Sequence, residues 1–239
     1  MTTSPRQPPA PARLRYALFD LDNTLYPADN GLWGAISERI NLYMIQRLQM
    51  PPAEAGALRR RYLHAFGNTL SGLRQDFGID GVEYLNFVHD LPLERYLRPD
   101  PALDAMLARL PQEKVIFTNA DTPHARRVLG HLGLSQHFTR IVDIVALNFV
   151  NKPEPRAYQR ALELLGAAPG ECVFVEDTAH NLPPAHDLGM CTVLVDNHPA
   201  ERAPAHPAAP GIDYSIADIL ELEDILAAAP CRSDALSAG

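Results

Sequence analysis

The sequence predicts an α/β fold built on a Rossmann-like parallel sheet, with a helical domain inserted after the first strand. Short apolar runs rich in Val, Ile and Phe recur along the chain, and amphipathic helical patterns lie between most of them. One long interval contains helical patterns only. Strands that alternate with helices form right-handed βαβ units, which place helices on both faces of a parallel sheet.

The strands are predicted from the apolar runs. They are short and rich in β-branched and aromatic residues, and most are bounded by polar or turn-forming residues, which is typical of strands buried on both faces. We expect strands over residues 16–21, 114–120, 140–145, 172–177 and 191–196, with a last short strand over 213–216.

The helices between these strands are predicted from their start and stop signals. Thr122 and Pro123 suit the N-cap and the first helical position, and Gly133 suits the end of that helix. The next helix lies within 153–167, where apolar residues recur at helical spacing up to Gly166. Shorter helices are expected over 181–190 and 216–229.

The interval that follows the first strand shows only helical patterns, over 32–50, 53–66 and 81–91. It is too long for a simple crossover, so we interpret it as a second, smaller domain. The expected organisation is a disordered leader (1–14), a core domain (15–28 and 99–229) that contains a Pro/Ala-rich loop (199–211), a helical cap domain (29–98) and a flexible tail (230–239).

Bulk composition excludes some classes of partner. The chain of 239 residues has a formal net charge of −8, so its overall field does not attract a nucleic acid polymer. No apolar run approaches the ~20 residues that a membrane-spanning helix needs. Three cysteines, Cys172, Cys191 and Cys231, show no paired or metal-type spacing, which favours free thiols in a reducing, cytoplasmic compartment.

Polar residues follow several of the predicted strands where a parallel sheet binds ligands, at its carboxyl edge. Asp20 and Asp22 end the first strand and point to the same side. Carboxylates collected at one edge suit a Mg²⁺ site, and a lysine and a hydroxyl beside them suit a phosphate group. The remaining members of this set are Thr118 and Asn119 after the second strand, Lys152 after the third, and Glu176 and Asp177 after the fourth.

Four segments, "DLDNTLY", "FTNA", "NKPEPRAY" and "VFVEDTAHN", resemble the motifs of the haloacid dehalogenase superfamily of phosphohydrolases. The resemblance implies that Asp20 is a nucleophile that forms an aspartyl phosphate and a metal ligand, and that Asp22 is the general acid/base and binds Mg²⁺ through its backbone carbonyl. Thr118, Asn119 and Lys152 would serve phosphate binding, with Lys152 also orienting Asp20. Asp177 would bind Mg²⁺ directly, and Glu176 directly or through water.

A finer resemblance concerns the substrate. "DNTLYP", the cap stretch "FGNTLSGL" (66–73) and "HDLPLERYL" (89–97) are similar to the pyrimidine 5′-nucleotidase group of that superfamily. This implies a pyrimidine nucleoside monophosphate as substrate, with Asn68 and Thr69 as candidates for base recognition. An ordinary helix N-cap explains Asn68 and Thr69 equally well.

Other activities remain open at this stage. The same chemistry could act on a sugar phosphate, phosphoglycolate or a vitamin phosphate. A haloacid dehalogenase shares the fold and the aspartate nucleophile, but it needs neither a metal nor the second acid. An inactive binding module is disfavoured because the whole set of polar residues is present. The arginines at 59–61 are interpreted as a solvated helix face, and His64 and His89 as surface or packing residues.

Overall fold

The computed structural model describes residues 14–196 and 210–228; most of the predicted leader, most of the Pro/Ala-rich loop and the predicted tail lie outside these residues. Six strands form one sheet in the order β3-β2-β1-β4-β5-β6, and every neighbouring pair is parallel. The predicted α/β fold is therefore confirmed. The strands are β1 (Tyr16–Phe19), β2 (Glu113–Phe117), β3 (Phe138–Val142), β4 (Cys172–Glu176), β5 (Cys191–Val195) and β6 (Tyr214–Ile216).

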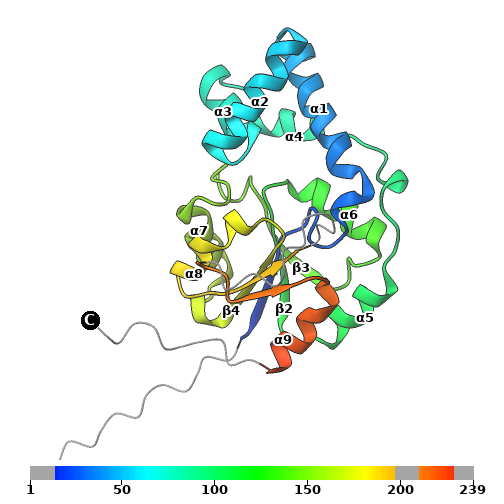
Figure 1. The fold of residues 1–239 in the computed structure, drawn as a ribbon, viewed down its shortest axis with the longest axis vertical. Coiled ribbons are helices and arrows are strands. Elements are labelled where there is room, and N and C mark those ends of the chain that lie inside the picture. Colours follow the sequence, from blue (N-terminus) through cyan, green and yellow to red (C-terminus); the bar gives the residue numbers. More distant parts are fainter. Residues whose placement is uncertain (1–13, 197–209, 229–239) are drawn as a thin grey trace, which may run out of the picture.

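Helices cover both faces of the sheet, with α7 and α8 on one side and α5, α6 and α9 on the other (Figure 1). The core helices are α5 (Pro101–Arg109), α6 (Thr122–Leu132), α7 (Pro155–Leu165), α8 (Pro183–Asp187) and α9 (Leu222–Ala228).

Strand β1 lies in the middle of the sheet and is buried on both faces. Tyr16 and Leu18 pack in the cluster under α7, and Ala17 and Phe19 pack in the cluster on the other face. Because side chains alternate along a strand, this continuous apolar run fills two cores at once. It also brings the residue that follows, Asp20, to the centre of the carboxyl edge.

Several predicted boundaries were wrong by a few residues; the first strand ends at Phe19 instead of 21, and the second at Phe117 instead of 120. The third strand ends at Val142 instead of 145, because the Asp143 carboxylate accepts hydrogen bonds from the backbone amides of Thr122 and Ala146 and holds the chain in a turn. Helix α6 is capped by Asp121, one residue before the predicted cap, since its carboxylate accepts from the amide of His124.

Between β1 and β2 the described chain is helical and contains no strand. Four helices make the cap above the carboxyl edge of the sheet (Figure 1): α1 (Leu32–Arg47), α2 (Pro52–Phe66), α3 (Thr69–Phe77) and α4 (Gly81–Val88). Helix α3, like α5 in the core, was not singled out by its sequence pattern. It packs closely on α2, where a Cβ on Gly72 would lie 2.3 Å from the ring of Tyr62.

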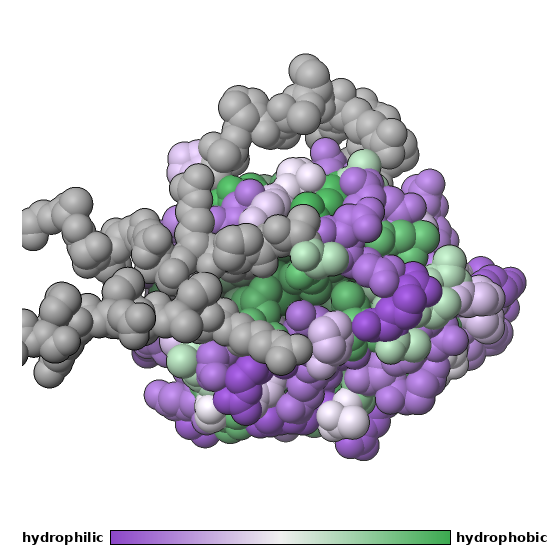
Figure 2. Space-filling model, turned by 90° about the horizontal axis from the view of Figure 1, so that it is seen from below, coloured by the Kyte–Doolittle hydropathy of each residue, from purple (hydrophilic) through white to green (hydrophobic). Residues whose placement is uncertain are grey.

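The surface is mainly polar. Figure 2, which views the molecule from the end opposite the cap, shows polar residues around an apolar area near the middle of that face. In the part of the chain that the structure describes, no helix is both long and apolar enough to span a membrane. Cys172 is free and buried as expected, but Cys191 is disulfide-bonded, so the expectation of free thiols was wrong there.

Candidate active site

A cavity of about 590 Å³ lies between the cap and the carboxyl edge of the sheet. Its floor contains Asp20, Asp22 and Lys152 from the core, and its cap side contains Arg59 and Thr69 among other residues. A volume of this size is typical of a small-molecule site. All the polar residues predicted at the strand ends line this cavity except Thr118.

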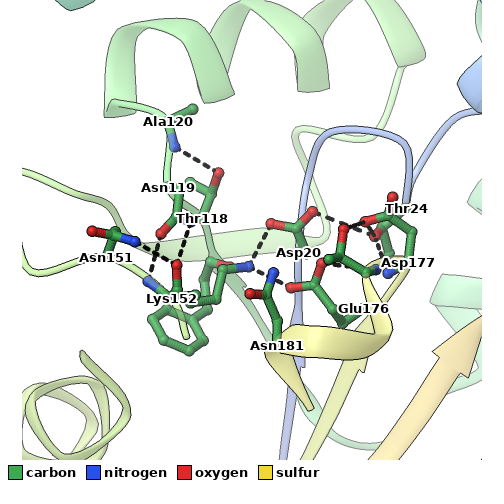
Figure 3. Close-up of polar contacts among 12 residues, drawn as sticks. Asp20, Thr24, Thr118, Asn119, Ala120, Asn151, Lys152, Glu176, Asp177 and Asn181 are labelled. Carbon is green, nitrogen blue, oxygen red and sulfur yellow. Dashed lines mark hydrogen bonds and ion pairs between the residues drawn. The ribbon is translucent and has the colours of Figure 1, made fainter. Parts of the chain in front are cut away.

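Lys152 is the centre of the floor. Its side chain is 1% exposed, and its ammonium group donates to Asp20 Oδ1 at 2.6 Å, to Glu176 Oε2 at 2.7 Å and to the backbone carbonyl of Phe117 at 2.9 Å (Figure 3). All three donor positions are thus used. Burial lowers the pKa of Lys152, but Asp20 and Glu176 outweigh it and raise that pKa to about 12, so the lysine stays charged.

The carboxylates around Lys152 carry more negative charge than it can balance. Burial, and then the neighbouring Glu176, raise the pKa of Asp20 to about 7. Burial also raises the pKa of Glu176 to about 7, although Lys152 opposes the shift. Burial and the charge of Asp20 raise the pKa of Asp177 to about 6. One more positive charge at this point would keep all three ionised at neutral pH.

Thr24 joins the first and last of these carboxylates. Its hydroxyl lies 3.4 Å from Asp20 Oδ2 and 3.3 Å from Asp177 Oδ1, and it accepts a hydrogen bond from the backbone amide of Asp177. Glu176 is used on both oxygens, by Lys152 and by the amide of Thr178. The Asp20 side chain is 11% exposed and that of Glu176 is 1% exposed, and Asp177 is only partly buried, so Asp20 and Asp177 are more open to a ligand than Glu176 is.

The second acid of the pair has different partners. Asp22 Oδ1 accepts from the Tyr26 hydroxyl at 2.6 Å and lies 3.0 Å from His124 Nε2. Burial alone would raise the pKa of Asp22, but the charge and hydrogen bond of His124, with the Tyr26 hydroxyl, lower it to about 2. Asp20 and Asp22 thus sit side by side in opposite electrostatic settings.

His124 stacks on His89 with 4.0 Å between ring centroids, and His89 Nδ1 lies 3.0 Å from Asp121 Oδ1. His89 follows α4, so this stack joins the cap segment to the start of α6. His89 is a packing residue, as expected, but it also supports the partner of Asp22. Sequence reasoning missed His124 and Tyr26; the only local signal was the position of His124 in the first turn of a helix at the carboxyl edge.

Two asparagines fix the segment that carries Lys152. The Asn119 amide accepts from the backbone amide of Lys152 at 2.9 Å and donates to its carbonyl at 3.1 Å. Asn151 donates to the carbonyl of Phe66 and accepts from the Ser71 hydroxyl, so it ties the cap to the core. Asn119 lines the cavity, yet its side chain is used to hold Lys152.

The remaining predicted residues lie as follows. Thr118 is buried, and its hydroxyl accepts from the amide of Ala120, which leaves its own hydrogen free to donate. Asn68 lines the cavity and caps α3, because its Oδ1 accepts from the amide of Ser71. Thr69 lines the cavity too, and its Oγ1 is buried without a partner. Asn68 therefore combines a helix cap with a free amide NH₂ group.

The residues present fit a divalent cation. Carboxylate oxygens of Asp20, Glu176 and Asp177 lie within 4.8 Å of one another. Hard oxygen donors in this arrangement suit Mg²⁺, and the raised pKa values of all three acids show that a cation is electrostatically favoured there.

Comparisons with curated proteins place this site in context. The chain is 30% identical over 201 residues to phosphate metabolism protein 8 of Saccharomyces cerevisiae (78% of this chain, 62% of that protein). It is 29% identical over 143 residues to (S)-2-haloacid dehalogenase of Xanthobacter autotrophicus (58% and 56%). It is 22% identical over 244 residues to N-acylneuraminate-9-phosphatase of Rattus norvegicus (92% and 97%). The match thus spans less than two thirds of the first two relatives.

The fold is shared with solved structures. A HAD phosphatase from Thermococcus onnurineus superposes with a TM-score of 0.57 at 24% identity, over 89% of this chain and 97% of that one. The sequence model of the haloacid dehalogenase-like hydrolase family matches residues 14–189, which include every polar residue of the cavity floor. This chain therefore belongs to the haloacid dehalogenase-like hydrolase family.

Proposed function

We propose that the protein is a Mg²⁺-dependent phosphomonoesterase that works through an aspartyl phosphate on Asp20. The observation that carries the proposal is the placement of Asp20 on the cavity floor, held by Lys152 and flanked by Asp177 and a second acid, Asp22. A carboxylate can accept a phosphoryl group, and a lysine and a hydroxyl beside it can stabilise the charge of that group.

The residues divide the reaction between them. A carboxylate oxygen of Asp20 attacks phosphorus, and the ester P–O bond breaks as the leaving oxygen takes a proton from Asp22. Asp22 then removes a proton from the water that attacks the same phosphorus, which releases phosphate and restores Asp20. Asp22 is an anion in the described arrangement, with its pKa at about 2. When Nε2 of His124 carries a proton, transfer of that proton along its hydrogen bond to Oδ1 would give Asp22 the proton that it passes to the leaving oxygen.

Asp20, Asp177 and the backbone carbonyl of Asp22 would hold Mg²⁺, with Glu176 acting directly or through water. When bound, the ion supplies positive charge that keeps neighbouring carboxylates ionised and offsets the charge of the phosphate. Lys152 keeps Asp20 oriented, and Thr118 can donate to a phosphate oxygen. Asn119 supports this arrangement by holding the backbone of Lys152.

For the leaving group we propose a pyrimidine nucleoside, with another small phosphate ester as the alternative. The cavity extends from the floor to cap residues that include Asn68 and Thr69, so the cap can select among leaving groups. A haloacid dehalogenase, the activity named for one relative, needs neither a metal nor the second acid, so the presence of Asp22 favours phosphate chemistry. A cytoplasmic location stays a prediction.

The direct test is a panel of phosphomonoesters assayed with purified protein and Mg²⁺. We expect hydrolysis of several esters, loss of activity with EDTA, and recovery when excess Mg²⁺ is added. A 2-haloacid serves as the control substrate and should release no halide. Activity that survives EDTA unchanged would contradict the metal assignment.

The acidic floor predicts a pH-dependent effect of Mg²⁺ on stability. Because Asp20 and Glu176 have raised pKa values in the folded protein, the folded state binds more protons than the unfolded state from about pH 4 to pH 7. Without metal, these groups therefore lower the free energy of unfolding as pH rises through that window. We expect Mg²⁺ to raise the melting temperature more at about pH 8 than at about pH 5.

Differential scanning fluorimetry with and without Mg²⁺ measures this difference. Asp177→Asn is the matched variant, because it removes one proposed metal ligand and one partly buried charge; the Mg²⁺-induced rise in its melting temperature at high pH should be smaller. An equal Mg²⁺ shift at both pH values would count against binding at these carboxylates.

Asn68 provides a test of base recognition that spares the helix. Asn68→Ser keeps a side-chain oxygen that can cap α3 but removes the amide NH₂ group. We expect UMP and CMP to be better substrates than AMP and GMP. Asn68→Ser should reduce that preference by up to roughly tenfold, since a hydrogen bond to a neutral group contributes about 0.5–1.5 kcal/mol.

Steady-state kcat/KM values for the four nucleotides and for 4-nitrophenyl phosphate check this result. The aryl ester should be hydrolysed almost as well by the variant as by the parent protein. If AMP matches UMP, or a sugar phosphate exceeds both, the nucleotidase proposal fails and the general phosphatase remains.

A further inference from the structure

Arg59, on the cap side of the cavity, differs in its exposure from the two arginines that follow it in sequence. Arg60 and Arg61 are exposed on α2, as expected for a solvated face, whereas Arg59 is partly buried and lines the cavity. The interpretation of all three as a solvated face was therefore wrong for Arg59. The helix turns Arg59 inward and leaves the next two outside.

Arg59 has unused hydrogen-bonding capacity. Its Nη2 donates to Ser37 Oγ on α1 at 2.7 Å, and its Nε is buried without a partner. No carboxylate of the described residues lies within ion-pair distance of it. The phenol of Tyr84 could act on it only as an anion, and burial raises the pKa of that phenol well above its usual value, so Tyr84 stays neutral. A guanidinium in this position lacks a counter-charge.

A second polar group on the same wall is also unpaired. Thr69 is 2% exposed, its Oγ1 has no hydrogen-bond partner, and it lines the same cavity. A buried polar atom without a partner is costly and calls for an explanation. The floor is different, because every donor of Lys152 is used.

The apolar surroundings of Arg59 and Thr69 strengthen the polar contacts that these side chains make with a ligand. The cap wall around these two groups is otherwise mainly apolar, and charge interactions are stronger in such a setting than in water. Burial lowers the pKa of Arg59, yet a guanidinium remains protonated at neutral pH. The apolar side chains of this wall are Ile36, Ile40, Leu63, Leu70, Leu85 and Val88.

We propose that Arg59, together with Thr69, binds the end of the leaving group that lies away from the phosphate, and that this end carries a planar group with two adjacent acceptor atoms. The guanidinium fork only donates, so it matches a carboxylate or the edge of cytosine, where the carbonyl oxygen and the adjacent ring nitrogen both accept. The inference rests on the proposed phosphatase function, because it assigns the other half of the same substrate.

Arg59→Met tests this assignment, with Arg60→Met as the matched control on the exposed face of the same helix. Two pairs of esters separate the two sources of the acceptor group: CMP against ribose 5-phosphate, and phosphoglycolate against glycerol phosphate. We expect Arg59→Met to lower kcat/KM by roughly 10- to 100-fold for the member of a pair that carries the acceptor group. The other member and 4-nitrophenyl phosphate should change by less than about threefold.

Arg59→Lys is the second variant, and it keeps the assignment testable if Arg59→Met does not fold. It retains the charge but not the fork, so it should preserve activity on a carboxylate substrate better than on a pyrimidine nucleotide. Arg60→Met should match the parent protein throughout.

Three results would overturn the inference. One is a uniform loss on all esters together with weaker inhibition by inorganic phosphate, which would place Arg59 at the phosphoryl group. The second is no change on any ester. The third is that the parent protein hydrolyses ribose 5-phosphate better than CMP, and glycerol phosphate better than phosphoglycolate. If the parent protein hydrolyses no phosphate ester at all, the proposed function fails instead.

Discussion

Asp20→Asn abolishes hydrolysis of every phosphate ester and leaves no phosphorylated protein after acid quenching: this is the largest effect that we expect. An amide oxygen is a poor nucleophile, and it cannot form the acyl phosphate that a carboxylate forms. The side chain at this position still reaches Lys152, so the geometry of the floor is kept. The measurement is kcat for several esters, with mass spectrometry of the quenched protein to detect the phosphoryl group.

Stability provides the control for this variant. Asp20 is a buried acid whose pKa is raised to about 7 by burial and by Glu176, so it is poorly accommodated as an anion without metal. Replacing it with a neutral amide removes that repulsion. We therefore expect the metal-free variant to melt no lower than the parent protein at neutral pH. An active Asp20→Asn protein, or a phosphorylated one, would assign the nucleophile to another residue.

Asp22→Asn has the second largest expected effect, a loss of roughly 10²–10⁴ in rate, because general acid–base catalysis contributes about that much. The variant keeps an oxygen that can accept from Tyr26 and His124, so the side chain stays in place while its proton chemistry is lost. The loss should depend on the leaving group. A phenolate departs without a proton, so phosphorylation by 4-nitrophenyl phosphate should suffer less than phosphorylation by a nucleotide.

Only the phosphorylation step can show this contrast, since water attack needs the base with either substrate. Rapid-quench measurement of phosphoenzyme formation isolates that step. Tyr26→Phe is a useful companion, because it removes one donor to Asp22 and leaves the carboxylate intact. Equal losses of phosphorylation rate on the two esters would argue that Asp22 is not the acid.

The sheet and the floor of the site could be read from sequence because both follow from local pattern. The continuous apolar runs locate the strands, and the polar residues directly after them must gather at one edge. Asp20 and Glu176 meet Lys152 for this reason. The interval after β1 shows only helical patterns in the sequence, and the inserted helices were predicted from it.

Features that depend on which way a side chain turns could not be predicted. A run of three arginines does not say which one faces inward, and only the packing of α2 against α1 turns Arg59 toward the cavity. His124 and Asp22 are far apart in sequence, and their contact needs both the strand order and the first turn of α6. The sequence allowed Asn68 to be either a helix N-cap or a base-recognition residue, and its bond to Ser71 at the start of the short helix α3 shows that it is a cap.

The insertion of the cap between β1 and β2 has a consequence for how the chain folds. These strands are neighbours at the centre of the sheet, yet every cap helix lies between them in sequence, so their pairing closes a long loop. Contacts within the cap helices are local and form early, whereas such distant pairing is slow. Asp20 reaches Lys152 only when β1 has docked between β2 and β4. Catalytic competence is therefore among the last properties that a refolding chain acquires, after most of its helix has formed.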